Sequence, residues 1–246
     1  MAIGLLGKKF GMTHVYDEFG HRRAVTAVQA GPCTVIRLRE PKRDGYQAVQ
    51  VGFGPISEKK LSKPRQGAFK KAGTGMFRYV REFRLPAPIK TGSEAPEWQV
   101  GQQLTVDLFK QYELVDVIGV SIGKGFQGGV RRWNWKGGPQ THGSMSHRAP
   151  GSIGSTTTPG RVFRGHHLPG HMGQDRVTIQ NLRILQLDPE NHLLLVEGSV
   201  PGAEEGLVII QKSTKRPGVI RKPQALTMVV EEEEEKGKKP AKPAKK

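Results

Sequence analysis

The residues of this chain that are suited to chemistry gather in one central stretch that lacks any carboxylate. Residues 117–174 contain no Asp and no Glu, but they hold seven Lys and Arg and five of the eight histidines. The aromatic residues Trp133, Trp135, Phe126 and Phe163 are interleaved with these cations. Basic side chains beside aromatic rings are typical of surfaces that bind nucleic acid. We call residues 117–174 the acid-free segment.

Each residue type in the acid-free segment matches one part of an RNA strand. Lysine and arginine bind phosphates, and arginine does so with two parallel hydrogen bonds. Hydroxyl groups reach phosphates and 2′-hydroxyls, whereas tryptophan and histidine stack on unpaired bases. The candidate RNA-binding side chains are Lys124, Arg131, Arg132, Trp133, Trp135, Lys136, His142, His147, Arg148, Ser152, Thr156, Thr157, Thr158, Arg161, Arg164, His166, His167 and His171.

The glycines of the same segment predict a close approach of the backbone to RNA. Glycine has no side chain, so it adopts positive φ and can lie directly against another surface. The candidates for such an approach are Gly123, Gly125, Gly128, Gly151, Gly154 and Gly160. Because the segment has no apolar periodicity from which to build a core, we expect RNA to supply the walls around it.

The motif GKGFQG at 123–128 offers the main alternative, an enzyme with a glycine-rich nucleotide site. It fits the Gly-x-Gly-x-x-Gly pattern, but a dinucleotide site needs an acid about 20 residues further on. That position carries Arg148, and the next acid is Asp175. A P-loop needs Ser or Thr after Gly-Lys, where this chain has Gly125. Since no carboxylate is present to orient a histidine, acid–base catalysis is also disfavoured. We expect no enzyme activity and no small-molecule substrate.

The histidines raise the further possibility of a metal site. His142 and His147 lie close in sequence, and His166, His167 and His171 form a second group. Zinc sites usually combine imidazoles with thiolates or carboxylates, and the acid-free segment has no Cys, Asp or Glu. We therefore expect no metal and no other cofactor. The single cysteine, Cys33, falls in a strand-like run and is expected to be a small buried hydrophobe.

The elements that must hold the acid-free segment are short strands on both sides of it. Alternating, β-branched runs bounded by turn residues predict strands, and the basic passage 57–75 predicts one short helix and a loop. We predict a mainly β fold, a closed antiparallel β-barrel with a long, largely irregular central extension and short helices. The predicted strands are two around a turn in 13–30, then 33–39, 46–53, 77–85, 102–109, 176–188, 192–198 and 207–212.

The predicted organisation has three parts. Residues 1–116 together with 175–215 form the β-barrel body, 117–174 the RNA-penetrating extension, and 216–246 a C-terminal tail. The tail's last part, 231–246, is predicted to be disordered, because five acids followed by six lysines with Pro and Gly cannot build a core. These charges nearly cancel, so the tail does not explain the net charge.

The charge of the whole chain points to a polyanionic partner. Lys and Arg number 39 against 22 Asp and Glu, a formal net charge of +17. An excess of this size repels itself unless a polyanion neutralises it. No apolar run is long enough to span a membrane, and Lys8 and Lys9 come too early for a signal peptide. We expect a cytoplasmic protein with no membrane partner.

Residues 109–133, FKQYELVDVIGVSIGKGFQGGVRRW, resemble the signature of the ribosomal protein L three family of the large ribosomal subunit. The likeness continues through THGSMSHRAPGSIG, TPGRVF, RVTIQNL, LLLVEGSVPG and the opening GLLGKKFGMT, and is closest to the bacterial branch. The resemblance implies a structural constituent of the ribosome that binds 23S rRNA, helps nucleate early subunit assembly and adjoins other large-subunit proteins. It also implies an extension that reaches toward the peptidyl-transferase centre, with GSIGSTTTPG near its tip.

The chain departs from that family's pattern at two places. Thr157 stands where many bacterial members have a glutamine that is methylated in some, so this modification cannot occur there. The tail beyond about residue 214 is longer than usual. The alternative to a structural ribosomal protein is an RNA-binding assembly or regulatory factor that is not retained in the mature particle.

Overall fold

Strands dominate the molecule, a computed structural model that describes residues 4–85 and 98–222. All strand pairings are antiparallel, and the longest helix, α2, spans only Lys63–Ala72. The prediction of a mainly β fold with antiparallel sheets and short helices is confirmed. Most of the predicted tail, including all of 231–246, lies outside the described residues. No helix within 4–85 or 98–222 has the length and apolar character needed to cross a bilayer.

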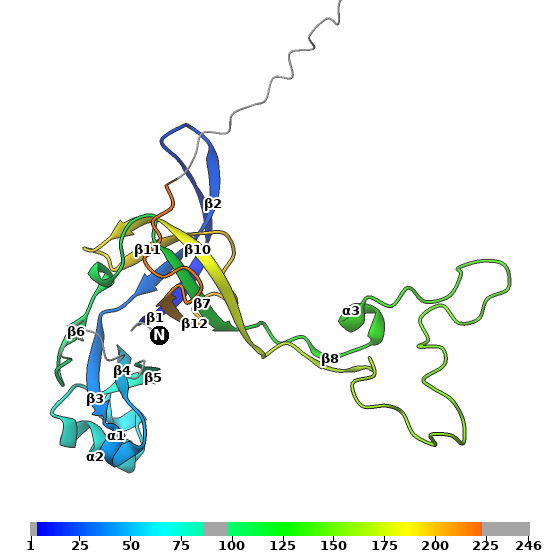
Figure 1. Ribbon diagram of the computed structural model, residues 1–246, viewed down its shortest axis with the longest axis horizontal. Coiled ribbons are helices and arrows are strands. Elements are labelled where there is room, and N and C mark those ends of the chain that lie inside the picture. The colour runs from blue at the N-terminus through cyan, green and yellow to red at the C-terminus, as the bar shows by residue number, and fades with distance from the viewer. Residues whose placement is uncertain (1–3, 86–97, 223–246) are drawn as a thin grey trace, which may run out of the picture.

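Six strands form a closed ring of backbone hydrogen bonds (Figure 1). Around the ring the order is β1-β12-β7-β10-β11-β2, and β2 pairs back with β1 to close it. Valine, leucine and isoleucine side chains from these strands, such as Val28, Val117, Leu194 and Ile210, are fully buried. The strands are β1 (Gly4–Tyr16), β2 (Arg22–Ala30), β7 (Leu114–Val120), β10 (Arg176–Asp188), β11 (Leu193–Glu197) and β12 (Leu207–Lys212).

A second, four-stranded sheet is inserted between β2 and β7. Its order is β5-β4-β3-β6, and α1 (Pro41–Asp44) and α2 are connected to it. Phe53, Phe83 and Leu104 of this sheet belong to the same buried cluster as Leu5 and Leu6 of the ring, so both sheets share one core. The strands are β3 (Cys33–Arg39), β4 (Ala48–Pro55), β5 (Phe77–Arg84) and β6 (Gln103–Leu104).

The strand expected over 102–109 is wrong in most of its length. Only β6, two residues long, is extended, and Val106–Leu108 form a 3-10 turn, η2. Val106 and Phe109 are both buried in the core, at 1% and 3% exposure. Side chains three positions apart point to opposite faces of a strand but to the same side of a helical turn. The core therefore selects the turn. A second turn, η1 (Glu58–Lys60), precedes α2. Both elements lie within 57–75, the passage for which the sequence predicts one short helix and a loop.

A buried carboxylate fixes the strands from which the acid-free segment departs. Asp116 of β7 accepts hydrogen bonds from the backbone N–H of Asn181 at 2.9 Å and of Thr214 at 3.0 Å. The Ser213 hydroxyl donates to the Asn181 side-chain oxygen at 2.7 Å. The register of β7 against β10 shifts between Ile179 and Leu182. The shift leaves the backbone N–H of Asn181 outside the strand pairing, where it can donate to Asp116. Asp116 thus ties β7, β10 and the chain after β12 together.

Candidate RNA interface

The acid-free segment leaves the ring as a narrow two-stranded stalk that continues β7 and β10 (Figure 1). The Ser121 N–H donates to the Asp175 carbonyl at 2.9 Å, and the Lys124 N–H donates to the Met172 carbonyl at 2.9 Å. At Gly173, with φ +84, a Cβ atom would lie 2.2 Å from the Ile122 carbonyl oxygen. Only glycine allows the two strands to approach this closely.

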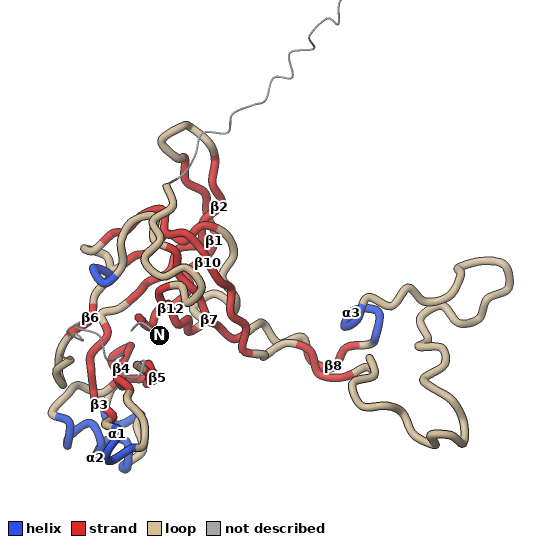
Figure 2. The backbone as a smooth tube through the Cα atoms, in the orientation of Figure 1, coloured by secondary structure: helices blue, strands red, loops and turns tan. Residues whose placement is uncertain are grey.

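Two short strands and one helical turn extend the stalk. Strand β8 (Gly125–Gln127) pairs antiparallel with β9 (Gly170–Met172), and α3 (Gly129–Trp133) follows β8 directly. Beyond α3 the chain is irregular until β9, as Figure 2 shows by its tan tube. The sequence prediction of a largely irregular segment therefore missed the β8–β9 pair, whose strands are only three residues long.

A cluster of polar and aromatic contacts closes the end of the stalk. Arg132 Nη1 and Trp133 Nε1 both donate to the Leu168 carbonyl, at 2.8 Å and 2.9 Å. The Trp133 ring stacks on His167 with centroids 4.1 Å apart and planes at 4°. The Arg132 guanidinium carbon lies 4.9 Å from the Trp133 ring centroid. We call Arg132, Trp133, His167 and Leu168 the stacked cluster; it joins the two arms of the segment before the loops begin.

Past the stacked cluster, the chain makes two loops, a first over 137–148 whose two sides are hydrogen-bonded to each other and a second over 150–165. In the first, the Gly138 N–H donates to the Ser146 carbonyl at 3.0 Å, and the His147 ring is hydrogen-bonded to the Pro139 carbonyl at 3.0 Å. In the second, Ser152 Oγ donates to the Gly154 carbonyl at 3.1 Å. Local hydrogen bonds of this kind define the loop paths although no apolar core lies beneath them.

The cations of the acid-free segment have no carboxylate partner in the part of the chain that the structure describes. Among the described residues, no ion pair within 4.0 Å involves any of the seven. By contrast, many arginines of the two sheets pair with carboxylates, for example Arg39 with Asp44 at 2.7 Å. Six of the seven cations are exposed, namely Lys124, Arg131, Lys136, Arg148, Arg161 and Arg164. Their charges are therefore free to bind phosphate.

Large apolar side chains are exposed on the same segment. Phe126 is 77% exposed, Phe163 64% and Met145 96%. These three side chains lie at separate points of the segment, on β8 and on the two loops, where each is open to a partner. Met145 was not among the sequence candidates because a lone methionine in a loop carries no local signal. Its exposure could only be read from the fold.

The structure separates the candidate histidines and hydroxyls into different parts of the segment. His171 lies on β9, His142 and His147 lie in the first loop, and His166 and His167 return to the stacked cluster. Within the described residues, no three His, Cys, Asp or Glu side chains are close enough to hold a metal ion. The hydroxyl candidates Ser152, Thr156, Thr157 and Thr158 are all exposed on the second loop.

The six candidate glycines differ in what requires them. Positive φ occurs at four of them, Gly125, Gly151, Gly154 and Gly160, so their own backbone conformation favours glycine. At Gly123 a Cβ atom would lie 3.3 Å from the Gln174 side chain. Gly128 has neither constraint: its φ is −71, and a Cβ atom there would meet nothing within 4 Å. Gly128 is the N-cap residue of α3, where glycine is well tolerated and where the described residues leave space for a side chain.

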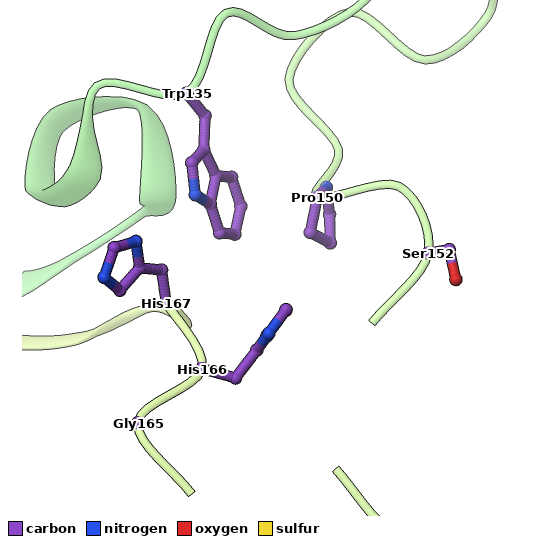
Figure 3. A pocket seen from close by; sticks show the side chains of 6 residues that line it. All are labelled: Trp135, Pro150, Ser152, Gly165, His166 and His167. Atoms are coloured by element: carbon purple, nitrogen blue, oxygen red, sulfur yellow. The ribbon is translucent and has the colours of Figure 1, made fainter. Parts of the chain in front are cut away.

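One cavity of about 390 Å³ opens between the stacked cluster and the second loop (Figure 3). Sequence candidates line most of it, and the structure adds Pro150 and Gly165 from the two ends of the loop. Trp135 projects from the chain just after α3, and His166 faces it from the returning arm. The lining residues are Trp135, Pro150, Ser152, Gly165, His166 and His167. We call this cavity the aromatic pocket.

Comparison with known proteins gives a consistent result. The family model described as Ribosomal protein L3 matches residues 94–193. The chain is 45% identical over 214 residues to the large ribosomal subunit protein uL3 of Brachyspira pilosicoli, covering 87% of this chain and 95% of that protein. It is 47% identical over 212 residues to uL3 of Heliobacterium modesticaldum, covering 86% and 97%. For uL3 of Thermosynechococcus vestitus the identity is 47% over 210 residues, covering 85% and 96%.

Proposed function

This chain belongs to the uL3 family of large ribosomal subunit proteins, and from that premise we propose that it binds 23S rRNA directly by placing its acid-free segment inside the RNA. It is a structural, non-enzymatic component of the large subunit and acts in translation. The proposal concerns which residues touch RNA and what the contact achieves.

One observation carries the proposal: the acid-free segment projects from the ring with unpaired cations and exposed aromatic rings. Six exposed cations without a carboxylate partner would repel one another on an isolated protein. Phosphates neutralise them, and unpaired bases cover rings such as Phe126 and Phe163.

The ring and the second sheet together form the proposed body of the protein. We propose that 1–116 together with 175–215 stays at the subunit surface beside neighbouring proteins, and that 117–174 enters the RNA beyond Val120, where β7 and the ring end. The shared core of the ring and the second sheet supports one body, and the stalk supports a projecting extension. The cytoplasm is the proposed location, and nucleation of early assembly follows from an extension around which RNA helices fold.

Retention in the mature particle tests the proposal against the alternative of a transient assembly factor. Large subunits carrying the tagged full-length chain are washed at moderate salt and sedimented. We expect near-stoichiometric retention of the wild-type chain. The Gly128→Leu variant should be washed off more readily, because a Cβ atom at 128 meets no group of the described residues within 4 Å and the added side chain would meet RNA.

The matched control is Gly67→Leu on α2. A Cβ atom at Gly67 also meets nothing within 4 Å, and the position is exposed and helical. Retention of Gly67→Leu should equal that of the wild type. Loss of the wild-type chain in the wash would favour the assembly factor, and full retention of Gly128→Leu would remove Gly128 from the RNA interface.

We also propose that the second loop acts on the peptidyl-transferase centre indirectly, by positioning RNA. No carboxylate of the described residues pairs with a group in this loop, so no oriented base is available for proton transfer. Thr157→Gln should leave subunit yield intact and change peptidyl transfer mildly. Gly154→Trp should impair both, because it adds bulk where φ is +152 and backbone approach is needed. Abolished transfer in fully assembled Thr157→Gln particles would contradict positioning.

A further inference from the structure

The aromatic pocket has walls that suit a flat ring. Trp135 and His166 face it from opposite arms of the acid-free segment, and Pro150 borders it (Figure 3). Its volume of about 390 Å³ lies at the lower end of the range of roughly 300–1,000 Å³ found for small-ligand sites. The pocket is therefore the size for one small aromatic group rather than for a helix or strand.

One face of the Trp135 indole packs on the backbone at Gly129. A Cβ atom at Gly129 would lie 2.1 to 2.2 Å from three neighbouring atoms of the indole ring, Cε3, Cδ2 and Cζ3. Nearly equal distances to three adjacent ring atoms mean that the face of the indole, not its edge, covers Gly129. The opposite face remains for the aromatic pocket that Trp135 lines. The ring is thus preorganised for stacking before any ligand enters.

The polar groups around the pocket are suited to a neutral ring carrying hydrogen-bonding edges. The indole N–H of Trp135 and the ring of His166 take part in none of the hydrogen bonds formed among the described residues. His167 is already stacked on Trp133, so it forms a fixed wall. None of the described residues that line the pocket is a carboxylate, which disfavours a cationic guest such as a lysine or arginine side chain.

We propose that the aromatic pocket captures one unpaired nucleobase of the RNA, stacked on the free face of Trp135 with its edge toward His166. The inference rests on the proposed function, since the exposed cations of the acid-free segment hold the strand that delivers the base. Beyond RNA binding in general, the base occupies a defined cavity, and the two tryptophans have different roles. Trp133 closes the stacked cluster within the protein, whereas Trp135 binds the ligand.

The experiment maps base accessibility in assembled large subunits that carry full-length variants. Subunits with wild-type, Trp135→Ala and Trp135→Phe chains are treated with base-specific chemical probes, and every 23S rRNA position is compared. In the wild type one unpaired nucleotide should be protected. Stacking on an aromatic ring is worth a factor of about 5 to 150 in the bound-to-free ratio of a base, so Trp135→Ala should expose that nucleotide by a comparable factor. Trp135→Phe should preserve most of the protection.

Two further variants separate ring placement from general damage. Gly129→Ala should expose the same nucleotide, because its methyl group displaces the indole while the ring itself is kept. Met12→Ala removes an exposed methionine of β1, outside the acid-free segment, and should leave that nucleotide protected. A dialysis of the free chain with adenosine monophosphate tests the other source of the same chemistry, a free nucleotide.

The results decide between the inference and the broader function. If Trp135→Ala particles retain the protein but show no localised change, the nucleobase site is refuted and RNA binding stands. If the wild-type chain fails to co-sediment with RNA at all, the proposed function fails with it. Tight, Trp135-dependent binding of the mononucleotide without any footprint in the particle would assign the pocket to a free ligand and also overturn the inference.

Discussion

The salt dependence of RNA binding depends on how many cations of the acid-free segment touch phosphates. Arg148, Arg161 and Arg164 are exposed on the two loops and have no carboxylate partner among the described residues. Replacing all three by glutamine removes three charges while retaining a polar side chain that can donate hydrogen bonds. Each phosphate contact releases bound counterions, so the logarithm of affinity falls linearly with the logarithm of salt concentration.

The expected size of the effect follows from the number of charges removed. Each contact adds roughly 0.7 to 0.9 to the slope, so the triple variant should be shallower by about 2 to 3. Over a fourfold rise in salt, the variant should lose roughly 20- to 40-fold less affinity than the wild type. Its affinity at low salt should be much lower, because the same three contacts are missing there.

Binding of the full-length chain to protein-free 23S rRNA, measured at a series of salt concentrations, gives the slope directly. Lys70→Gln is the control, since its ammonium group already pairs with Glu58 at 2.6 Å and should contribute little to phosphate binding. A triple variant with the wild-type slope and unchanged far-ultraviolet circular dichroism would refute the reasoning. The loops would then not touch phosphate, and the main contact would lie elsewhere on the chain.

Three further predictions concern the body that carries the acid-free segment. Asp116→Ala should lower the free energy of unfolding by about 2–4 kcal/mol in urea titrations, because two backbone N–H groups lose their buried acceptor; a change under 1 kcal/mol would contradict this. Gly52→Ala should cost about 1–3 kcal/mol in the same assay, since its methyl group would lie 2.5 Å from the Phe77 ring. Burial raises the pKa of the Cys33 thiol from 9.0 to about 12, so iodoacetamide should not label the native chain at pH 8 and should label it in urea. Cys33 does not change the free energy of unfolding below pH 9. Between pH 9 and 12 the unfolded chain loses the thiol proton first, so the free energy of unfolding falls. Cys33→Ala should lack this additional fall.

Local patterns in the sequence predicted much of the body correctly. The runs 33–39, 176–188 and 207–212 coincide with β3, β10 and β12, because β-branched alternation is a property of the strand itself. The turn expected in 13–30 joins β1 and β2, with the Asp17 carboxylate accepting backbone hydrogen bonds from Phe19 and His21. The first part of β1 was not predicted, since GLLGKKFGM breaks alternation with glycines and lysines.

Other features had no local signature. The 3-10 turn at 106–108 forms because Val106 and Phe109 both reach the core, which their neighbours in sequence do not reveal. The division of the strands between the ring and a second sheet depends on pairings such as β1 with β12, from opposite ends of the chain. Leu168 holds Arg132 and Trp133 through its carbonyl group, which every residue type possesses, so no sequence signal could identify it.

The sequence by itself determined the chemistry of this protein. Acids are excluded from 117–174, and cations, aromatic rings and glycines are placed there, so the type of partner follows from composition alone. Only the tertiary structure decided which of those residues act together. It stacks Trp133 on His167 in the stacked cluster and leaves one face of Trp135 to the aromatic pocket, although both tryptophans stood as equal candidates. The reason is physical: charge and polarity belong to each residue, whereas a pocket or a stack exists only after distant parts of the chain have been brought together.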